Sequence, residues 1–259
     1  MHLHFKELGQ GEPLVILHGL FGSSDNWLGV APKLAHDFHV YLLDLRNHGL
    51  SPHSDEMDFS LMAGDVAEFL DAHKLDRVNL LGHSLGGKVA MQFALTFPDR
   101  LKTVIVVDMA PRAYAPEHNT IFKALLALDL KQFQSRRQIE DTLAPAIPDL
   151  TVRRFLLKNL QTDPDTRAFS WRIPLDTLYA NYPKLCEAIE TSDRHARVFE
   201  KPTLFLHGGK SPYVTDADAP QIQKLFPMSK IEAIAKANHW VHAEAPDEFV
   251  QRVSEFLGR

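Results

Sequence analysis

The segment Gly82–Gly86, with the pattern G-x-S-x-G around Ser84, constrains the fold of this chain more than any other stretch. The apolar residues 78–81 before it have the length and β-propensity of a buried strand, and residues 87–95 after it have the pattern of a helix. A strand that enters a helix through such a turn is the setting of a nucleophile elbow, which raises the serine above the edge of a sheet. Glycine at both ends of the segment avoids Cβ clashes where helix and strand pack closely. The pattern therefore predicts that Ser84 is a nucleophile.

Short apolar runs alternate with helical patterns over most of the chain. We expect buried strands at 14–17, 39–43, 78–81, 103–107, 203–206 and 230–234, with helices at 60–73, after Ser84 and from about Pro246. Strands separated by helices imply right-handed crossovers and a mostly parallel sheet that is covered on both faces. The predicted fold class is therefore α/β, with a doubly wound sheet.

The pattern changes after Pro111. From Glu117 to about Ile189 the periodicity is helical, prolines divide it into short pieces, and no run reads as a buried strand. We expect residues 112–195 to form a helical cap, inserted into a core domain made of residues 1–111 and 196–259. Such a cap would lie over the carboxyl edge of the sheet, where open α/β folds bind ligands.

Composition excludes several classes of protein. With 45% hydrophobic and 24% charged residues in 259, the chain has the make-up of an ordinary globular protein. A net charge of −5 without a basic stripe gives no reason to expect nucleic-acid binding. The single cysteine, Cys186, excludes an intramolecular disulfide and fits a reducing compartment. Without a signal peptide or an apolar run of roughly 20 residues, we expect a cytoplasmic protein that has no contact with membranes. The sequence leaves the oligomeric state open, with a monomer as the expectation.

A serine nucleophile needs a base and donors for the oxyanion. A histidine taken alone is more often a core or surface residue, but His239 follows the last expected strand and lies C-terminal to the serine. It is therefore the expected base, and His242 is expected to support the same loop. The segment His18–Gly22 follows the first long strand, so the N–H groups of Leu20 and Leu85 are the expected oxyanion donors.

Five motifs in order carry a resemblance to a known family. They lie at 18–23, 44–52, 82–87, 208–214 and 239–244. The chain resembles the α/β-hydrolase superfamily over essentially its whole length and, more closely, the bacterial YbfF-type esterases. The resemblance implies hydrolysis of carboxylic esters or thioesters through an acyl-enzyme, without a metal or an organic cofactor. No histidine, cysteine or carboxylate spacing in the chain indicates a zinc site either.

The acid that orients the base departs from the pattern of the wider superfamily. That pattern places it a few residues after the strand at 203–206, where this chain has Ser211. Asp108, at the end of the strand 103–107, is the expected substitute, although an aspartate there could simply cap a loop. Asp216 and Asp218 are the alternatives.

Several further residues could contact a substrate or be structural. Phe21, Trp171 and Trp240 are expected to line an acyl pocket, although the tryptophans could equally belong to the core. Cations of the expected cap could meet an anionic substrate, but solvated helix faces are the simpler interpretation for Arg136, Arg137, Arg153, Arg154 and Lys158. Asp44 and Arg46 are expected to form a buried pair that shapes their loop.

The expected activity is that of a serine esterase or thioesterase. The alternatives with the same residues are C–C bond hydrolysis and cofactor-free perhydrolysis. A non-catalytic small-molecule receptor on the same fold is the alternative from another class.

Overall fold

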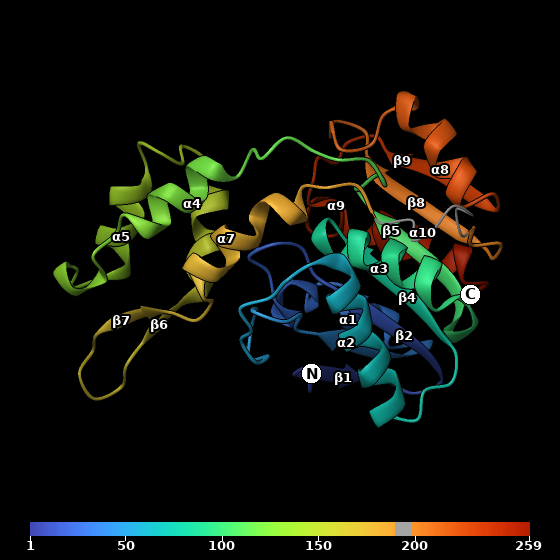
Figure 1. The fold of residues 1–259 in the computed structure, drawn as a ribbon, viewed down its shortest axis with the longest axis horizontal. Coiled ribbons are helices and arrows are strands. Elements are labelled where there is room, and N and C mark those ends of the chain that lie inside the picture. Colours follow the sequence, from blue (N-terminus) through green and yellow to red (C-terminus); the bar gives the residue numbers. More distant parts are fainter. Residues whose placement is uncertain (190–197) are drawn as a thin grey trace.

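A seven-stranded sheet forms the centre of the molecule in the computed structural model, which describes residues 1–189 and 198–259 (Figure 1). Its strands are β1 (Phe5–Leu8), β2 (Glu12–Leu17), β3 (Phe38–Leu43), β4 (Val78–His83), β5 (Leu101–Val107), β8 (Thr203–Gly208) and β9 (Ser229–Ile234). They lie in the order β1-β3-β2-β4-β5-β8-β9, and every neighbouring pair is parallel except β1 and β3. The expected mostly parallel sheet is confirmed, and β1 is an additional edge strand.

Helices cover both faces of this sheet. They are α1 (Ala31–Leu34), α2 (Phe59–Ala72), α3 (Leu85–Thr96), α8 (Ala219–Leu225), α9 (Val241–Glu244) and α10 (Pro246–Phe256). In β2, Leu14 and Ile16 pack in one core with residues of α1 and α10, whereas Val15 and Leu17 pack in the other with residues of α2 and α3. Because both faces are buried, the central strands are continuous apolar runs, which is why the sequence predicts them.

The strand order reverses beside the expected nucleophile. From β2 the chain passes outward to β3 and then returns to β4 on the other side of β2. Leu17 at the end of β2 therefore lies opposite Gly82 near the end of β4. Open α/β sheets bind ligands at such a reversal, outside the carboxyl ends of the strands. The segment after β2 and the turn after β4 meet at that place.

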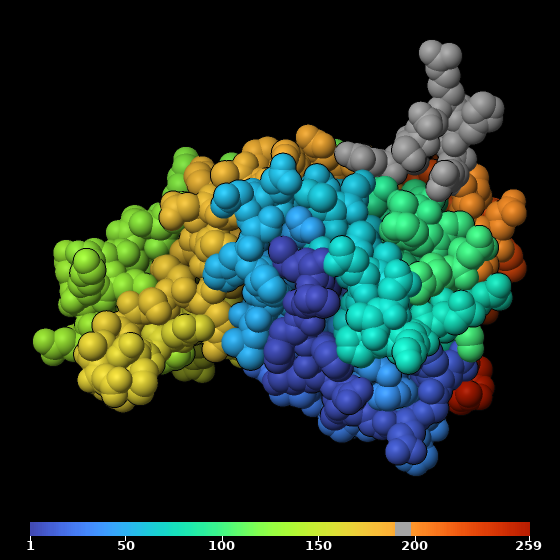
Figure 2. All heavy atoms as spheres, turned by 60° about the horizontal axis from the view of Figure 1, so that its bottom comes forward, coloured from blue at the N-terminus to red at the C-terminus, as the bar shows by residue number. Residues whose placement is uncertain are grey.

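The segment between β5 and β8 forms a lobe beside the sheet (Figures 1 and 2). We refer to its residues 112–189 as the insertion; the expected end of the cap at residue 195 lies outside the described residues. The elements of the insertion are α4 (Asn119–Leu126), α5 (Arg136–Leu143), α6 (Leu150–Leu156), β6 (Leu160–Thr162), β7 (Phe169–Trp171) and α7 (Leu175–Leu185). The expectation of an all-helical block is wrong in one respect, because β6 and β7 form an antiparallel hairpin. Strands of three residues are too short to show a period.

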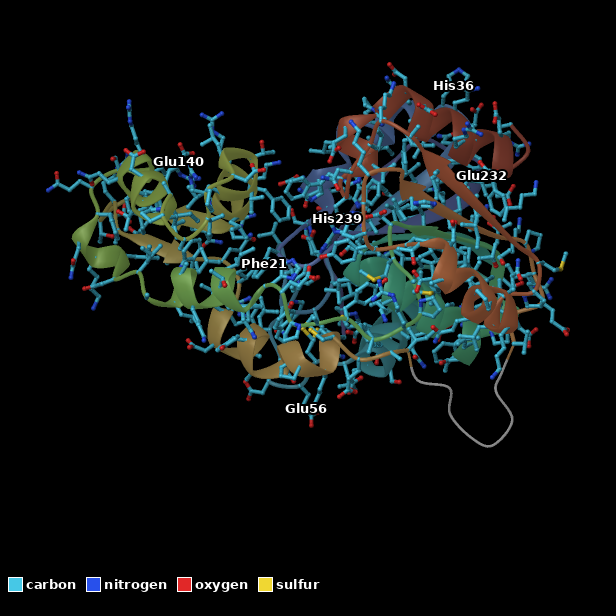
Figure 3. All side chains as sticks on the ribbon, turned by 90° about the horizontal axis from the view of Figure 1, so that it is seen from above. Phe21, His36, Glu56, Glu140, Glu232 and His239 are labelled. Atoms are coloured by element: carbon cyan, nitrogen blue, oxygen red, sulfur yellow. The ribbon has the colours of Figure 1, made fainter. Side chains whose placement is uncertain are left out.

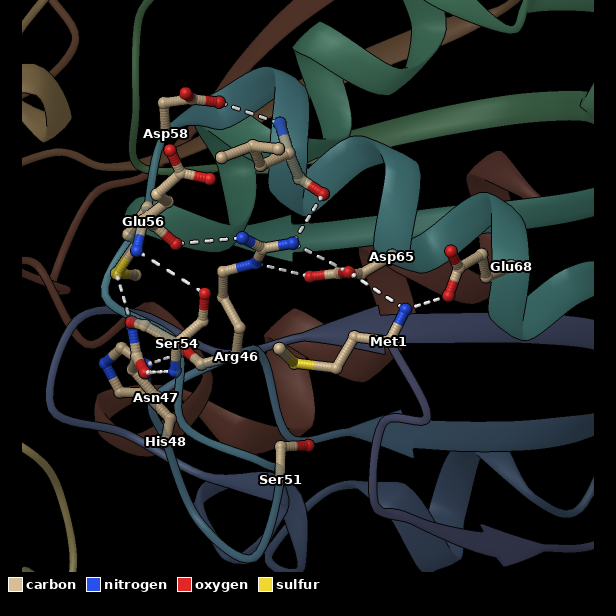
Figure 4. Close-up of polar contacts among 12 residues, drawn as sticks. Met1, Arg46, Asn47, His48, Ser51, Ser54, Glu56, Asp58, Asp65 and Glu68 are labelled. Atoms are coloured by element: carbon tan, nitrogen blue, oxygen red, sulfur yellow. Dashed lines mark hydrogen bonds and ion pairs between the residues drawn. The ribbon is translucent and has the colours of Figure 1, made fainter.

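The loop after β3 is held by a buried charge pair, and its partners differ from those expected. Arg46 forms a bidentate pair with Asp65 of α2, with Nε to Oδ2 at 2.6 Å and Nη2 to Oδ1 at 2.8 Å (Figure 4). Arg46 Nη1 also donates to the carbonyl of Glu56 at 2.8 Å. The predicted pair of Asp44 with Arg46 is wrong. The Asp44 carboxylate instead accepts from the N–H of Leu50 in its own loop and from that of Ser24 in the segment after β2.

The Arg46–Asp65 pair predicts a large effect on stability. Asp65→Asn leaves a buried guanidinium without its charge partner, and we expect the free energy of unfolding to fall by about 3 kcal/mol. Urea unfolding of the variant measures this. As a control, Asp141→Asn removes the exposed pair with Arg137, 3.8 Å apart, and should change stability by less than about 0.5 kcal/mol. Equal effects of the two substitutions would contradict the structural role of Arg46.

Candidate active site

The turn between β4 and α3 holds Ser84 in a strained conformation. Its φ is 53° and its ψ is −116°, a region that residues with a side chain rarely occupy. Close packing around the turn explains the glycines: a Cβ on Gly82 would lie 2.0 Å from the carbonyl oxygen of Gly86. A Cβ on Gly86 would lie 2.6 Å from the carbonyl oxygen of Leu17. The turn is therefore pressed against the end of β2 and permits only glycine at these two positions.

The structure brings Asp108 and His239 together. Asp108 follows β5 with a φ of 51° and is completely buried, whereas His239 lies in the loop between β9 and α9. The distance from His239 Nδ1 to Asp108 Oδ2 is 2.7 Å. An ionised carboxylate only accepts, so the Nδ1–H donates to it and the second ring nitrogen, Nε2, is left as an acceptor. Figure 3 shows His239 where the insertion meets the sheet, close to Phe21.

The Asp108 carboxylate has two further donors. Its Oδ1 accepts from the N–H of Gly208 at 3.0 Å, and its Oδ2 accepts from the hydroxyl of Ser211. Ser211 is the residue that stands where the wider superfamily keeps its acid, so the serine there hydrogen-bonds to the carboxylate that comes from the neighbouring strand. Three donors on one buried carboxylate fix its orientation.

The alternative acids lie elsewhere. The buried carboxylate of Asp218 accepts from Arg112 Nε at 2.8 Å and from the N–H of Thr215 at 2.9 Å. Asp216 is exposed in the short 3-10 helix Asp216–Asp218. In the described part of the chain neither of these carboxylates contacts His239, whereas the Asp108 carboxylate does.

Two backbone N–H groups are available beside Ser84. In the turn after β2, the N–H of Phe21 donates to His48 Nε2 and that of Gly22 donates to the carbonyl of Gly19. Within residues 1–189 and 198–259, the N–H groups of Leu20 and Leu85 have no hydrogen-bond partner. Both residues line the same pocket as Ser84. They are the N–H groups expected for an oxyanion hole.

A pocket of about 460 Å³ opens at Ser84 and His239. One wall comes from the turn after β2 and the loop of His239, and the other from α4 and α6 of the insertion. Phe21 and Trp240 line it as expected, and the Trp240 ring lies 5.5 Å from that of Phe155 in α6. Trp171 is not among the lining residues, because it belongs to the hairpin strand β7. A second pocket of about 50 Å³ adjoins Ser84 on the side of Tyr114 and Tyr182.

Several aromatic residues around His239 were not predicted from the sequence. The Tyr213 ring stacks on the imidazole of His239 with centroids 4.2 Å apart. His83, which precedes the nucleophile, has its Nε2 at 2.9 Å from the carbonyl oxygen of His239. Burial lowers the pKa of His83 well below its usual value, with His239 and His242 adding to the effect, so this ring donates as a neutral group. Both residues hold the loop that carries His239.

Four of the five cations considered in the sequence analysis have structural partners, one of them being Arg137 with Asp141. Arg136 donates to the carbonyls of Leu157 and Leu160, and Arg153 donates to that of Ile147. Arg154 lies 3.4 Å from the carboxylate of Glu140. Lys158 is exposed and lines the pocket of about 460 Å³.

The described residues contain no group of three or more histidine, cysteine, aspartate or glutamate side chains that could hold a metal ion. In the same part of the chain, every helix is too short or too polar to cross a membrane.

Comparisons with known proteins identify the family of the fold. The profile of a family described as alpha/beta hydrolase fold matches residues 12–246. The chain is 36% identical over 261 residues to the sn-1-specific diacylglycerol lipase ABHD11 of Danio rerio, covering 98% of this chain and 80% of that protein. It is 35% identical over 248 residues to Esterase YbfF of Escherichia coli strain K12, covering 95% and 92%. The solved structure of a marine microorganism esterase superposes with a TM-score of 0.93 at 41% identity and 98% coverage of both chains. The resemblance indicated by the motifs is confirmed.

The buried His242 predicts a pH dependence of stability. Burial, aided by His239 and Lys158, lowers its pKa to about 3, and its Nδ1 has no partner among the described residues. The unfolded chain, in which the pKa of histidine is about 6.5, therefore binds an extra proton between these values, so stability is lost as the pH falls from 6.5 towards 3. In His242→Gln, the free energy of unfolding, measured with urea near pH 5, should fall less steeply with decreasing pH than in the wild type, by about 1.4 kcal/mol per pH unit. His36→Gln, at an exposed histidine, is the control. An unchanged pH dependence of stability in His242→Gln would contradict the low pKa of His242.

Proposed function

The chain belongs to the alpha/beta hydrolase fold family, and on that premise we propose that it is a serine esterase that hydrolyses carboxylic esters or thioesters. The observation that carries the proposal is the 2.7 Å contact of His239 with the buried Asp108, at the pocket that Ser84 also lines. The names of its relatives, a diacylglycerol lipase and esterases, support an ester as the substrate.

In the proposed mechanism, His239 Nε2 takes the proton of the Ser84 hydroxyl while the oxygen attacks the acyl carbonyl. Asp108 holds the imidazole in the required tautomer and stabilises the imidazolium that forms. The N–H groups of Leu20 and Leu85 hold the oxyanion. His239 then gives its proton to the leaving alcohol or thiol, and the acyl group stays on Ser84. Water, activated by the same imidazole, releases the acid and restores the serine.

The pocket suggests which part of the substrate lies where. Its walls beyond Ser84 carry apolar side chains such as Phe21, Ile121 and Phe155, which suit an acyl chain of moderate length. The second pocket, at about 50 Å³, has room only for a small group. A series of p-nitrophenyl esters and acyl-CoA thioesters of increasing chain length measures the preference.

The two enzymatic alternatives, C–C bond hydrolysis and perhydrolysis, use the same residues, but the names of the relatives favour ester hydrolysis. We also propose that the chain acts as a monomer, because Ser84, Asp108, His239 and both oxyanion donors come from one chain. We also propose a cytoplasmic location, because the free thiol of Cys186 suits a reducing compartment.

The role of Ser84 predicts a loss of covalent labelling. Ser84→Ala removes the attacking oxygen, and we expect it to abolish both ester hydrolysis and labelling by a fluorophosphonate probe. Circular dichroism should show an unchanged fold, because the strained turn is set by the glycines around it. Labelling that persists at another serine would mean that the nucleophile lies elsewhere, and an unlabelled wild type would favour a non-catalytic receptor.

The role of Asp108 predicts a selective loss of turnover. In Asp108→Asn the imidazole is held in the wrong tautomer, and in a serine protease the equivalent change lowers kcat about 10⁴-fold. We expect a loss that approaches this value, measured as kcat with p-nitrophenyl acetate.

Two controls separate Asp108 from the other acids. Asp216→Asn and Asp218→Asn should cost far less, because neither carboxylate contacts His239. The pair Asp108→Ala with Ser211→Asp should recover part of the activity, since the Ser211 hydroxyl already lies within hydrogen-bond distance of the Asp108 carboxylate. Near-normal turnover in Asp108→Asn together with a collapse in Asp216→Asn would show that Asp108 is not the acid and that its assignment to the end of β5 is wrong.

A further inference from the structure

A buried lysine stands one helical turn after the expected nucleophile. Lys88 of α3 is only 1% exposed, and its backbone N–H bonds to the carbonyl of Ser84. Its Nζ donates to three backbone carbonyls: to Pro111 at 3.2 Å, to Glu187 at 3.0 Å and to Arg112. Lysine is almost never fully buried unless its charge is partnered. The proposed hydrolysis assigns no chemical step to this side chain.

The three carbonyls lie where the chain enters and leaves the insertion. Pro111 and Arg112 follow β5, and Glu187 follows α7 on the return. We call these two segments, 111–114 and 186–189, the crossings. They are also bonded to each other, through the Tyr114 N–H to the Cys186 carbonyl at 2.8 Å and the Ile189 N–H to the Pro111 carbonyl at 3.1 Å. Lys88 therefore joins both crossings to α3, the helix that directly follows Ser84.

We propose that Lys88 is a positioning residue that holds both crossings of the insertion against the nucleophile helix and so sets where the insertion's wall of the substrate pocket lies relative to Ser84. This inference rests on the proposed esterase function and deepens it, because it names the residue on which recognition of a long acyl group depends. An ammonium group has three N–H donors, which match the three carbonyls. An apolar side chain of the same length would leave all three without this donor.

The Asp108 carboxylate is held independently of Lys88. Asp108 is fixed by Gly208, Ser211 and His239, and none of these contacts involves the crossings. Two amides tie more distant parts of the insertion to the core, through Asn159 to the Phe21 carbonyl and Asn181 to the Asp55 carbonyl. Loss of Lys88 should therefore loosen the insertion at the crossings rather than release it.

The experiment compares Lys88→Met with Lys201→Met. Lys201 is a matched control, since its Nζ donates to the carbonyls of Pro98 and Leu101 at 2.8 Å each, both outside the insertion. The measured quantity is the ratio of kcat/KM for p-nitrophenyl octanoate to that for p-nitrophenyl acetate. If the insertion wall is in place only about a tenth of the time in Lys88→Met, this ratio falls about tenfold, mainly through the KM of the octanoate. In Lys201→Met the ratio should stay unchanged even if stability falls.

Hydrogen exchange provides a readout that needs no activity. In Lys88→Met the amides of Tyr114 and Ile189 should exchange faster, whereas those of β4 and α3 should not. An unchanged ratio and unchanged exchange in a folded Lys88→Met would overturn the proposal while leaving the esterase function standing. A wild type that hydrolyses no ester would overturn that function, and the exchange data would still decide the role of Lys88.

If Lys88→Met does not fold, wild-type exchange decides instead. The amides of Tyr114 and Ile189 should then be protected nearly as well as those of α3, and far better than the exposed turn between β6 and β7. Exchange at the crossings as fast as in that turn would overturn the proposal, because the crossings would then not be held.

Discussion

The carboxylate of Asp108 receives three hydrogen bonds from two separate parts of the chain, and the arrangement of the site depends on them. The donors are the N–H of Gly208 at the end of β8, the hydroxyl of Ser211 and the imidazole of His239 in the loop after β9. The N–H of Asp108 itself donates to the Leu206 carbonyl at 3.0 Å. Because the carboxylate is completely buried, each of these charge-assisted bonds is stronger than it would be in water. They join the ends of β5 and β8 to the loop that carries the proposed base.

Close approaches of the backbone bring the other groups to the same edge of the sheet. Glycine at 86 lets the turn of Ser84 press on the end of β2, which places Leu20 beside it, and glycine at 82 lets the end of β4 approach the start of α3. Gly208 does the same for the loop of His239, since a Cβ there would lie 2.1 Å from the Asn238 carbonyl oxygen. The nucleophile, the base and the oxyanion donors thus come from loops whose positions are set by rigid strands. The insertion then supplies the second wall of the pocket, with Lys88 proposed as the residue that holds it.

Much of the fold and of the candidate site could be predicted from the sequence, and the predictions that were wrong or missing have physical causes. The central strands are buried on both faces, so their apolar runs are easily recognised, whereas the edge strand β1 and the hairpin β6–β7 are too short or too polar to stand out. The pair of Arg46 with Asp65 joins a loop to a helix 19 residues away, which no local pattern encodes. The expectation that Trp171 lines the acyl pocket is wrong for the same reason, because tertiary packing decides which side chains line a pocket. Lys88 did leave a signal, because it is the one cation in a helix of otherwise apolar, small or uncharged residues.

The proposed contact of Asp108 with His239 is tested most directly by low-field proton NMR. An imidazole N–H that donates to a buried carboxylate at 2.7 Å should give a strongly downfield resonance in the wild type. We expect this resonance to disappear in Asp108→Asn and in His239→Gln and to remain in Asp218→Asn. A resonance that persists in Asp108→Asn, or that is lost in Asp218→Asn, would contradict the assignment of Asp108 as the residue that orients the base.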